Sequence, residues 1–279
     1  MDISFVKMHG AGNDFVVMDN RGGAIRLDAA RIRAMCDRRR GVGADGVILI
    51  EGAEEADFRM RYYNSDGGEA EMCGNGARCA AFHAVRLGLG EGRGETVHVR
   101  FVTGPGLIEG HVEGCQVAIS MTDATSFKKG VCLPVAEGEE IVHFIDTGVP
   151  HAVVVEKDVW ALDDRAVAGR GRAIRMHSAF EPDGANVDFV TTLDDGRVAV
   201  RTYERGVEAE TEACGTGAVA AAVVLAKLGK ARSPVTLVTR GGETLSVSLE
   251  EAAWGASGVV LTGPTAVSFQ GTMRLSRGE

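Results

Sequence analysis

Two cysteines stand in nearly the same context at distant points of the chain. Residues 72–79 read MCGNGARC and residues 213–220 read ACGTGAVA, so Cys73 and Cys214 each precede Gly-X-Gly-Ala and small helix-forming residues. A cysteine at the start of a helix lies beside backbone amides that have no acceptor within the helix. Such amides bind carboxylates, and they also stabilise a thiolate, which lowers the pKa of the thiol. Each corner therefore predicts a reactive thiol beside an anion-binding turn.

A pair of such thiols suits one class of reaction. A single cysteine at a helix start is more often a packing residue, but its recurrence in matched context favours function. If two lobes place the corners on opposite sides of one ligand, a thiolate removes a proton from a carbon and the other thiol returns one. The amides of both turns then stabilise the developing negative charge in a site closed to water. The pattern indicates inversion of a stereocentre without a cofactor.

The elements that position the cysteines repeat as well. Cys73 and Cys214 are 141 residues apart, and the same offset relates three further pairs: Gly88 and Gly229, Tyr62 and Tyr203, and Gly43-Ala44 and Gly184-Ala185. Both single glycines are expected to end a helix as C′ residues. We predict an internal duplication of roughly 120 residues. One lobe would hold residues 1–122 with about 263–279 and carry Cys73, and the other would hold 123–262 and carry Cys214, with the boundary between them near 120–140.

The secondary structure predicted around the corners is α+β. Short β-branched runs between turn residues predict strands at 47–50, 97–102, 151–155, 235–239 and 244–249. Capping residues and small or periodic apolar residues predict helices at 28–40, 76–87, 163–173 and 217–228.

Composition excludes several classes of protein. The chain has 279 residues, 45% of them hydrophobic, and its formal net charge of −9 is scattered. No basic stripe predicts nucleic-acid binding. No apolar run approaches the roughly 18 residues of a membrane span, and no signal-peptide pattern opens the sequence. We expect a cytoplasmic protein whose six cysteines are thiols.

Five segments carry a resemblance to a known family. They are KMHGAGNDFVVMD (7–19), RYYNSDGGEAEMCGNGARCAA (61–81), GVPHAVV (148–154), GANVDFV (184–190) and YERGVEAETEACGTGAVAAA (203–222). Over nearly its whole length the chain resembles the diaminopimelate epimerases. The resemblance implies two pseudo-symmetric lobes, each a curved, mostly antiparallel sheet around a central helix. It implies a cofactor-independent isomerase, often homodimeric, that converts LL-2,6-diaminopimelate to the meso form in lysine and peptidoglycan biosynthesis.

The resemblance also assigns roles to matching residues. Cys73 and Cys214 would be the base and acid pair, and His151 and Glu204 would tune the two thiols. The carboxylate at the reacting centre would be held by amides of Gly74, Asn75, Gly215 and Thr216. The rest of the substrate, chiefly its distal amino-acid end, would be recognised by Asn13, Asn64, Asn186, Glu204 and Arg205. These side chains suit a zwitterion, because Arg forks onto a carboxylate and Asn both donates and accepts.

Two positions depart from the family pattern. Val149 stands where the family often has Asn, and Gly46 stands where it often has an amide side chain. Both positions contact substrate in the family. A racemase of another amino acid on the same fold is therefore the alternative function.

Other interpretations account for fewer of these residues. Residues 41–46, GVGADG, match a dinucleotide-binding pattern but precede a strand and follow a helix, which is the reverse of the required order. No paired Cys-X-X-Cys accompanies Cys73 and Cys79, so no metal site is predicted. A thiol–disulfide enzyme or peroxide sensor using Cys73 and Cys214 would leave the Asn and Arg residues without a purpose. An amino-acid-binding protein would need neither thiol.

Overall fold

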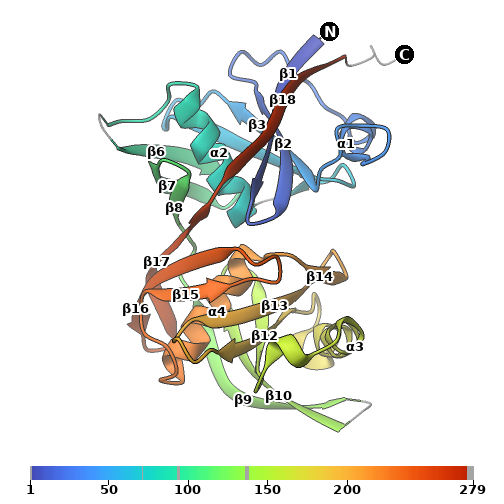
Figure 1. The fold of residues 1–279 in the computed structure, drawn as a ribbon, viewed down its shortest axis with the longest axis vertical. Coiled ribbons are helices and arrows are strands. Elements are labelled where there is room, and N and C mark those ends of the chain that lie inside the picture. Colours follow the sequence, from blue (N-terminus) through green and yellow to red (C-terminus); the bar gives the residue numbers. More distant parts are fainter. Residues whose placement is uncertain (1, 71, 93–94, 136–137, 275–279) are drawn as a thin grey trace. The chain divides into compact units, whose positions relative to one another are not determined.

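The chain forms two compact units. The computed structural model describes residues 2–70, 72–92, 95–135 and 138–274. Unit 1 comprises Met1–Ile119 and Gly263–Glu279, and unit 2 comprises Ser120–Thr262 (Figure 1). Unit 1 is therefore built from both ends of the chain, and unit 2 from its middle.

Unit 1 is one mixed, mostly antiparallel sheet with two helices. Its strands follow the order β18-β1-β2-β3-β4-β6-β7-β8, and only the β2–β3 and β4–β6 pairs are parallel. A short strand, β5, pairs with β4. The strands are β1 (Asp2–Gly10), β2 (Asn13–Asp19), β3 (Gly46–Glu51), β4 (Phe58–Asn64), β5 (Glu69–Ala70), β6 (Thr96–Thr103), β7 (Gly106–Glu113), β8 (Gln116–Ser120) and β18 (Ala266–Arg274). The helices are α1 (Ala29–Cys36) and α2 (Gly74–Arg86).

Unit 2 repeats this topology. Its order is β9-β10-β11-β12-β13-β15-β16-β17, with β14 on β13, and only β11–β12 and β13–β15 are parallel. The strands are β9 (Thr125–Val135), β10 (Gly138–Asp146), β11 (Pro150–Val155), β12 (Asn186–Thr192), β13 (Val198–Glu204), β14 (Ala209–Thr211), β15 (Val235–Val238), β16 (Thr244–Ala252) and β17 (Gly255–Pro264). The helices are α3 (Asp164–Arg175) and α4 (Gly215–Lys227), with two short 3₁₀ turns at Val159–Ala161 and Ser178–Phe180.

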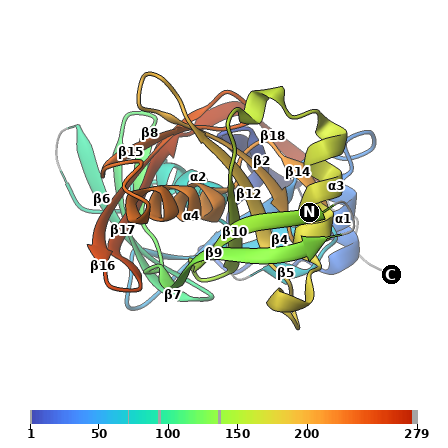
Figure 2. The same ribbon diagram turned by 90° about the horizontal axis from the view of Figure 1, so that it is seen from below.

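Each sheet curves around one central helix. Helix α2 contacts β1, β2, β3, β4, β6 and β7, which are six consecutive strands of unit 1. Flat strands about 4.8 Å apart would span roughly 24 Å, about twice the diameter of a helix, so the sheet must bend around α2. Helix α4 contacts the strands of unit 2 in the same way, and Figure 2 shows those strands on both sides of it. The predicted α+β fold is confirmed.

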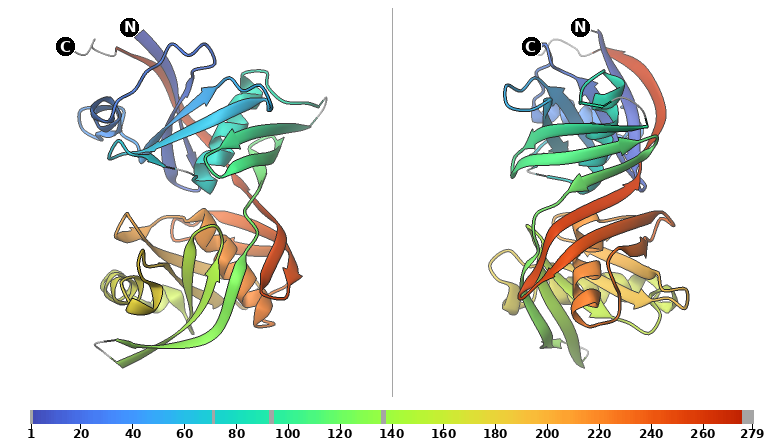
Figure 3. Two further views of the ribbon diagram at one scale, coloured as in Figure 1. Left: turned by 180° about the vertical axis from the view of Figure 1, so that it is seen from behind. Right: turned by 90° about the vertical axis from the view of Figure 1, so that its left-hand side faces the viewer.

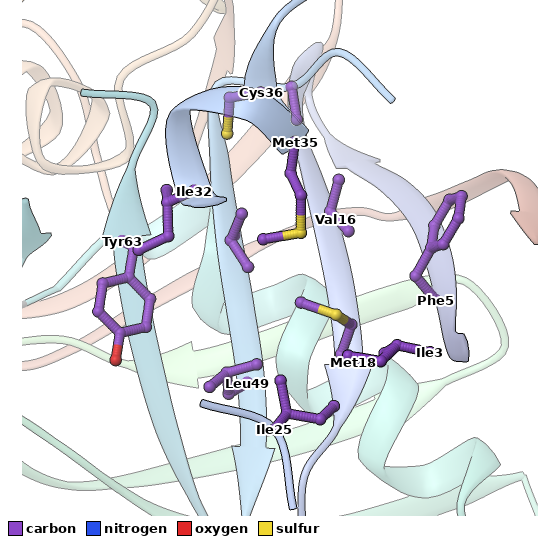
Figure 4. Packing of buried hydrophobic residues seen from close by; sticks show 12 residues of the cluster. Ile3, Phe5, Val16, Met18, Ile25, Ile32, Met35, Cys36, Leu49 and Tyr63 are labelled. Atoms are coloured by element: carbon purple, nitrogen blue, oxygen red, sulfur yellow. The ribbon is translucent and has the colours of Figure 1, made fainter. Parts of the chain in front are cut away.

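The other helix of each unit, α1 in unit 1 and α3 in unit 2, covers the outer face of its sheet. In unit 1, Ile32 and Met35 of α1 point toward Val16 and Leu49 of the sheet (Figure 4). In unit 2, α3 packs on the equivalent face through Val167 and Ile174. Both faces of each sheet are thus buried, which explains the continuous apolar runs of β3 and β11.

The repeat is exact in topology but not in spacing. Helices α2 and α4 begin 141 residues apart, whereas the strand pair Val47–Tyr63 matches Val187–Tyr203, an offset of 140. The predicted equivalence of Tyr62 and Tyr203 is therefore wrong. Tyr63, like Tyr203, packs on the outer face, whereas the Tyr62 ring meets Phe15 edge-on. One additional residue between β13 and α4 accounts for the change of offset.

The predicted helix ends are confirmed where a glycine closes them. Gly88 and Gly229 have φ of 81° and 69°. The N–H of Leu89 bonds the carbonyl of Ala84, and that of Lys230 bonds Leu225, so each glycine lies at C′ of a Schellman motif.

One predicted helix end is corrected. The first helix ends at Cys36, not at residue 40, because the Asp37 carboxylate accepts the N–H groups of Arg39 and Arg40 in a turn. Unit 2 begins at Ser120, and the segment that follows is largely strand β9, whose mostly exposed residues show no alternation. Among the described helices, none is long and apolar enough to cross a membrane.

Candidate active site

Cys73 is the N-cap of α2 in unit 1. It is half-buried, its backbone is extended, and its sulfur accepts the N–H of Gly76 at 3.5 Å. Glycine is needed at 76 because a Cβ there would lie 3.1 Å from Ile48 Cδ1 and 3.3 Å from Met60 Cε. The small residue lets the first turn of α2 sit directly on the sheet. The amides predicted to bind a carboxylate, those of Gly74 and Asn75, thus open a helix as expected.

Two amide side chains, those of Asn13 and Asn75, meet beside the Cys73 sulfur. The thiol donates to Asn13 Oδ1 at 3.4 Å, and Asn75 Nδ2 donates to the same oxygen at 3.3 Å. Asn13 Nδ2 in turn donates to Asp45 Oδ2 at 2.8 Å. Because a carboxylate only accepts, Asp45 fixes the orientation of the Asn13 amide. The carbonyl oxygen of Asn13 therefore faces the thiol.

Arg78 lies beneath the same turn and is fully buried. Its Nη2 donates to Asn75 Oδ1 at 2.9 Å, and its Nη1 donates to the carbonyl of Gly74. Its Nε has no hydrogen-bond partner within the described residues. Burial lowers the pKa of this guanidinium, which places a poorly compensated positive charge under an expected carboxylate site. A charged residue among the small residues of GNGARC was the sequence signal for it.

Asn64 and Gly46 are paired across β3 and β4. Asn64 is exposed, and its Oδ1 accepts the hydroxyl of Tyr62 at 2.8 Å. A Cβ at position 46 would lie 2.6 Å from the Tyr62 ring and 2.5 Å from the carbonyl of Tyr63. The space that a side chain at 46 would use is thus filled by Tyr62, which supplies a polar group of its own.

Cys214 is the N-cap of α4 in unit 2. It is half-buried, and its sulfur accepts the N–H of Gly217 at 3.4 Å and lies 3.4 Å from Thr216 Oγ1. Gly215 and Thr216 open the helix, as their counterparts do in unit 1. The same capped turn therefore occurs once in each unit.

The acidity expected for a thiol at a helix start is not found at Cys214. Burial, followed by the charges of Glu204 and Asp188, raises the pKa of this thiol well above its ordinary value. The hydrogen bonds from Thr216 and Gly217 act in the opposite direction and are outweighed. Burial also raises the pKa of Glu204, whose carboxylate accepts hydrogen bonds from Thr211 and Cys214. Cys214 is therefore a thiol at neutral pH in this arrangement.

His151 belongs to a buried polar cluster near Cys214. Its Nδ1 lies 2.7 Å from Asp188 Oδ2, and neither side chain is exposed. Asp188 Oδ1 accepts the hydroxyl of Thr202 at 2.7 Å. Asn186 Nδ2 lies 3.5 Å from His151 Nε2, and Asn186 Oδ1 accepts the backbone N–H of Arg205 at 2.9 Å. Unit 2 thus connects His151, Asn186 and Arg205 through hydrogen bonds.

Two predicted side chains, those of Val149 and Arg205, make no hydrogen bond to this cluster within the part of the chain that the structure describes. Val149 is half-buried at the turn between β10 and β11, where its carbonyl accepts the N–H of Thr147. The guanidinium of Arg205 is half-buried and makes no hydrogen bond or ion pair with residues that the structure describes, which leaves it available to a ligand. Asn13 and Val149 lie two residues before Phe15 and His151, which occupy equivalent ladder positions in the two units.

Sequence reasoning missed Asp188, Thr202, Thr211, Asp45 and Arg78. Asp188 lies inside GANVDFV, and a charge within a buried strand was a usable signal. The sequence did not indicate the partner of Asp188, because His151 is 37 residues away and meets it only through the parallel pairing of β11 and β12.

Comparison with known proteins identifies the family. The model of the diaminopimelate epimerase family matches residues 5–127 and 143–267. The chain belongs to this family. The diaminopimelate epimerase of Chlorobaculum tepidum is 43% identical over 270 residues, which cover 96% of this chain and 100% of that protein. The diaminopimelate epimerase of Aquifex aeolicus is 40% identical and covers 97% and 98% of the two chains.

Solved structures with the same fold include more distant proteins. A hydroxyproline epimerase from Agrobacterium vitis, solved with trans-4-OH-L-proline, has a TM-score of 0.76 at 18% identity, covering 97% of this chain and 92% of its own. A PhzF-family phenazine biosynthesis protein from Bacillus anthracis has a TM-score of 0.72 at 15% identity, covering 99% and 100%. At these identities the likeness concerns the fold alone. The diaminopimelate epimerase family therefore rests on the sequence match, and the fold agrees with it.

Proposed function

We propose that the chain epimerises LL-2,6-diaminopimelate to meso-diaminopimelate, a step of lysine and peptidoglycan biosynthesis, without a cofactor. The observation that carries the proposal is the duplicated corner, in which a cysteine caps a glycine-rich helix start once in each unit. Membership of the diaminopimelate epimerase family supports the choice of substrate.

The reaction needs both cysteines. In the direction from LL to meso, one thiolate removes the proton from the α-carbon and becomes a thiol. The other thiol donates its proton to the opposite face of the same carbon and becomes a thiolate. Cys73 and Cys214 exchange these roles when the reaction reverses. The proposal requires the two corners to face one substrate carbon from opposite sides.

The amide groups supply what an electron-sink cofactor would otherwise provide. As the α-proton leaves, negative charge moves onto the carboxylate of the reacting centre. The N–H groups of Gly74, Asn75, Gly215 and Thr216 would bind these oxygens, and such fixed donors stabilise the transition state more than the ground state. The buried charge of Arg78 beneath the first turn of α2 adds to this field.

Substrate recognition would rest on polar groups from both units. Asn13, Asn64 and Asn186 suit the ammonium and carboxylate groups of the distal end, Arg205 suits its carboxylate, and Glu204 suits an ammonium group. His151 and Glu204 would tune the thiols. Gly46 and Val149 lack the side-chain donors that the family often has at these two positions. A racemase acting on another amino acid is therefore the second candidate.

The test is proton exchange followed by NMR. The reduced, folded protein is given LL-diaminopimelate in D₂O with no added metal or cofactor. We expect deuterium at one α-carbon together with meso product. The absence of both would exclude this substrate, and a panel of other amino acids would then test the second candidate.

Serine variants test the two-base mechanism. Cys73→Ser and Cys214→Ser should each lower kcat by about 10²-fold or more, because a hydroxyl is a far weaker acid and base at neutral pH. Cys115→Ser is the matched control, since Cys115 is an exposed thiol outside both corners. Near-normal turnover in either of the first two variants would contradict the mechanism.

We further propose that the protein acts in the cytoplasm as a homodimer, as the family resemblance suggests. Sedimentation velocity at micromolar concentration tests the assembly. A species with the mass of one chain across the concentrations used in the activity assay would contradict it.

A further inference from the structure

Three hydrogen-bonded polar side chains form a cluster at the first turn of α4, and two of them, Asp188 and Thr202, lie against Gly217. They come from three neighbouring strands: His151 from β11, Asp188 from β12 and Thr202 from β13. His151 and Asp188 are fully buried, and Thr202 is 3% exposed. A Cβ at Gly217 would lie 2.4 Å from Asp188 Oδ1, so the helix start sits directly on the carboxylate. Burying a carboxylate is costly, which calls for a reason for this placement.

The other half of the molecule shows that packing is not the reason. The strand registers of unit 1 put Phe15, Ile48 and Tyr62 at the positions of His151, Asp188 and Thr202. There Gly76 rests on Ile48 and Phe15, and the helix start packs on apolar atoms. The duplicated fold thus supports a cysteine-capped helix without a buried carboxylate. The polar cluster of unit 2 serves a different purpose.

The hydrogen bonds define the proton positions on His151. Asp188 accepts only, so the Nδ1 that lies 2.7 Å from it carries a proton. The backbone N–H of Arg205 holds the carbonyl oxygen of the Asn186 amide, which turns Asn186 Nδ2 toward His151 Nε2. Nε2 therefore faces a donor and presents its lone pair. Two independent contacts define the same tautomer.

We propose that Asp188 is a positioning residue that holds His151 in the Nδ1-protonated tautomer, so that Nε2 exchanges a proton with a reacting thiol. The inference rests on the proposed function. In the step, the S–H proton moves to Nε2 and leaves a thiolate and an imidazolium. Asp188 stabilises the imidazolium, and the proton returns by the reverse path. Thr202 fixes the second oxygen of Asp188 and so holds the carboxylate in line with Nδ1.

The charged groups around the cluster are compatible with this role. The charges of His151 and Asp188 act on Glu204, and the charges of Glu204 and Asp188 act on Cys214. The charge of Asp188 helps to raise the pKa of Cys214, which keeps that thiol protonated. One carboxylate thus accepts the Nδ1 proton of His151 and also favours a protonated Cys214.

The test compares Asp188→Asn with Thr202→Val in the full-length protein. Asparagine keeps the shape but carries no charge and can donate to Nδ1, which favours the Nε2-protonated tautomer. We expect kcat to fall by about 10²-fold or more, as for loss of a general base, with KM changed by less than about threefold. The acid limb of the pH profile of kcat should also shift in Asp188→Asn. Thr202→Val retains the charge and should lower kcat by less than about tenfold.

Imidazole nitrogen NMR provides the readout that a structural role would not change. Two-bond ¹⁵N–¹H spectra should show His151 protonated at Nδ1 in the wild type and at Nε2 in Asp188→Asn. Unchanged kcat and tautomer in the variant would overturn the proposal. If the variant does not fold, the wild-type spectrum still decides, since a neutral His151 protonated at Nε2 overturns it. Failure of the proposed function would instead appear as a wild-type protein without proton exchange on diaminopimelate.

Discussion

At the scale of single residues, the two thiols share a backbone setting but not an electrostatic one. Cys73 lies among amide side chains above the buried cation of Arg78. Cys214 lies near Glu204 and Asp188, whose charges favour its protonated form. Duplication kept the capped helix start and changed the side chains beneath it. Two chemically identical groups are thereby prepared for opposite tasks in the proposed reaction.

Arg205 provides a test of substrate binding at this scale. Its backbone N–H is fixed by Asn186, and its guanidinium is half-buried. Arg205→Lys keeps the charge but loses the planar fork that matches a carboxylate. We expect KM for diaminopimelate to rise by about tenfold, equivalent to about 1.4 kcal/mol, while kcat changes less. Steady-state kinetics measure both, and an unchanged KM would remove Arg205 from the site.

At the scale of elements, replacing glycine by alanine should change stability in opposite directions at a helix end and inside a helix. Gly229 ends α4 at φ 69° with open space around a Cβ, so Gly229→Ala costs only the left-handed conformation, about 1 kcal/mol. Gly169 lies inside α3, also with open space and without a positive φ. Gly169→Ala should stabilise by about 0.5–1 kcal/mol through helix propensity. Urea unfolding of both variants measures the difference, and the same sign for both would contradict the assignment.

The buried end of α2 predicts a pH dependence of stability. His83 is 7% exposed, its Nδ1 has no partner within the described residues, and burial lowers its pKa to about 4. Between about pH 6.5 and 4 the unfolded chain binds a proton that the folded chain refuses, so stability falls as the pH falls through this window. The loss is on the order of 3 kcal/mol.

His83→Gln isolates this effect. The variant should lose less stability than the wild type between pH 6.5 and 4, and the two should run in parallel above pH 7. Denaturant unfolding at several pH values gives the slopes. Equal slopes throughout the acid range would mean that His83 is not the responsible group.

Elements with local signals were predictable, and those with distant partners were not. The runs of small residues after Cys73 and Cys214, closed by Gly88 and Gly229, identified α2 and α4 to within two residues. Strand β9 was not predicted because its residues are mostly exposed and are ordered by pairing with β10. The contact of Asp188 with His151 was not predicted for a related reason, since only the sheet topology places these two residues side by side.

At the scale of the whole chain, unit 2 is inserted between two strands of unit 1. Strand β18 pairs with β1 along its length, and the two lie side by side in Figure 3. Phe269 of β18 meets Phe5 edge-on at 6.0 Å between ring centroids, and Met273 packs on the apolar cluster around α1. The last strand therefore completes the unit that carries Cys73.

Removal of β18 should damage one unit selectively. A chain ending at Pro264 would leave the outer edge of β1 unpaired and expose Phe5. We expect hydrogen exchange to become fast in β1 and β2 while α4 remains protected, and proton exchange on the substrate to be lost. Amides of α4 in the same sample provide the internal control. Retained protection in β1 would contradict the role given to β18.

The same insertion sets an order of events during translation. A nascent chain that has emerged as far as Pro264 holds every strand of unit 2 but lacks an edge strand of unit 1. The half that carries Cys214 can mature on the ribosome, whereas the half that carries Cys73 waits for residues 266–274. Deprotonation chemistry would thus begin only after synthesis has passed this final strand, and an unfinished chain would carry one assembled thiol corner and no activity.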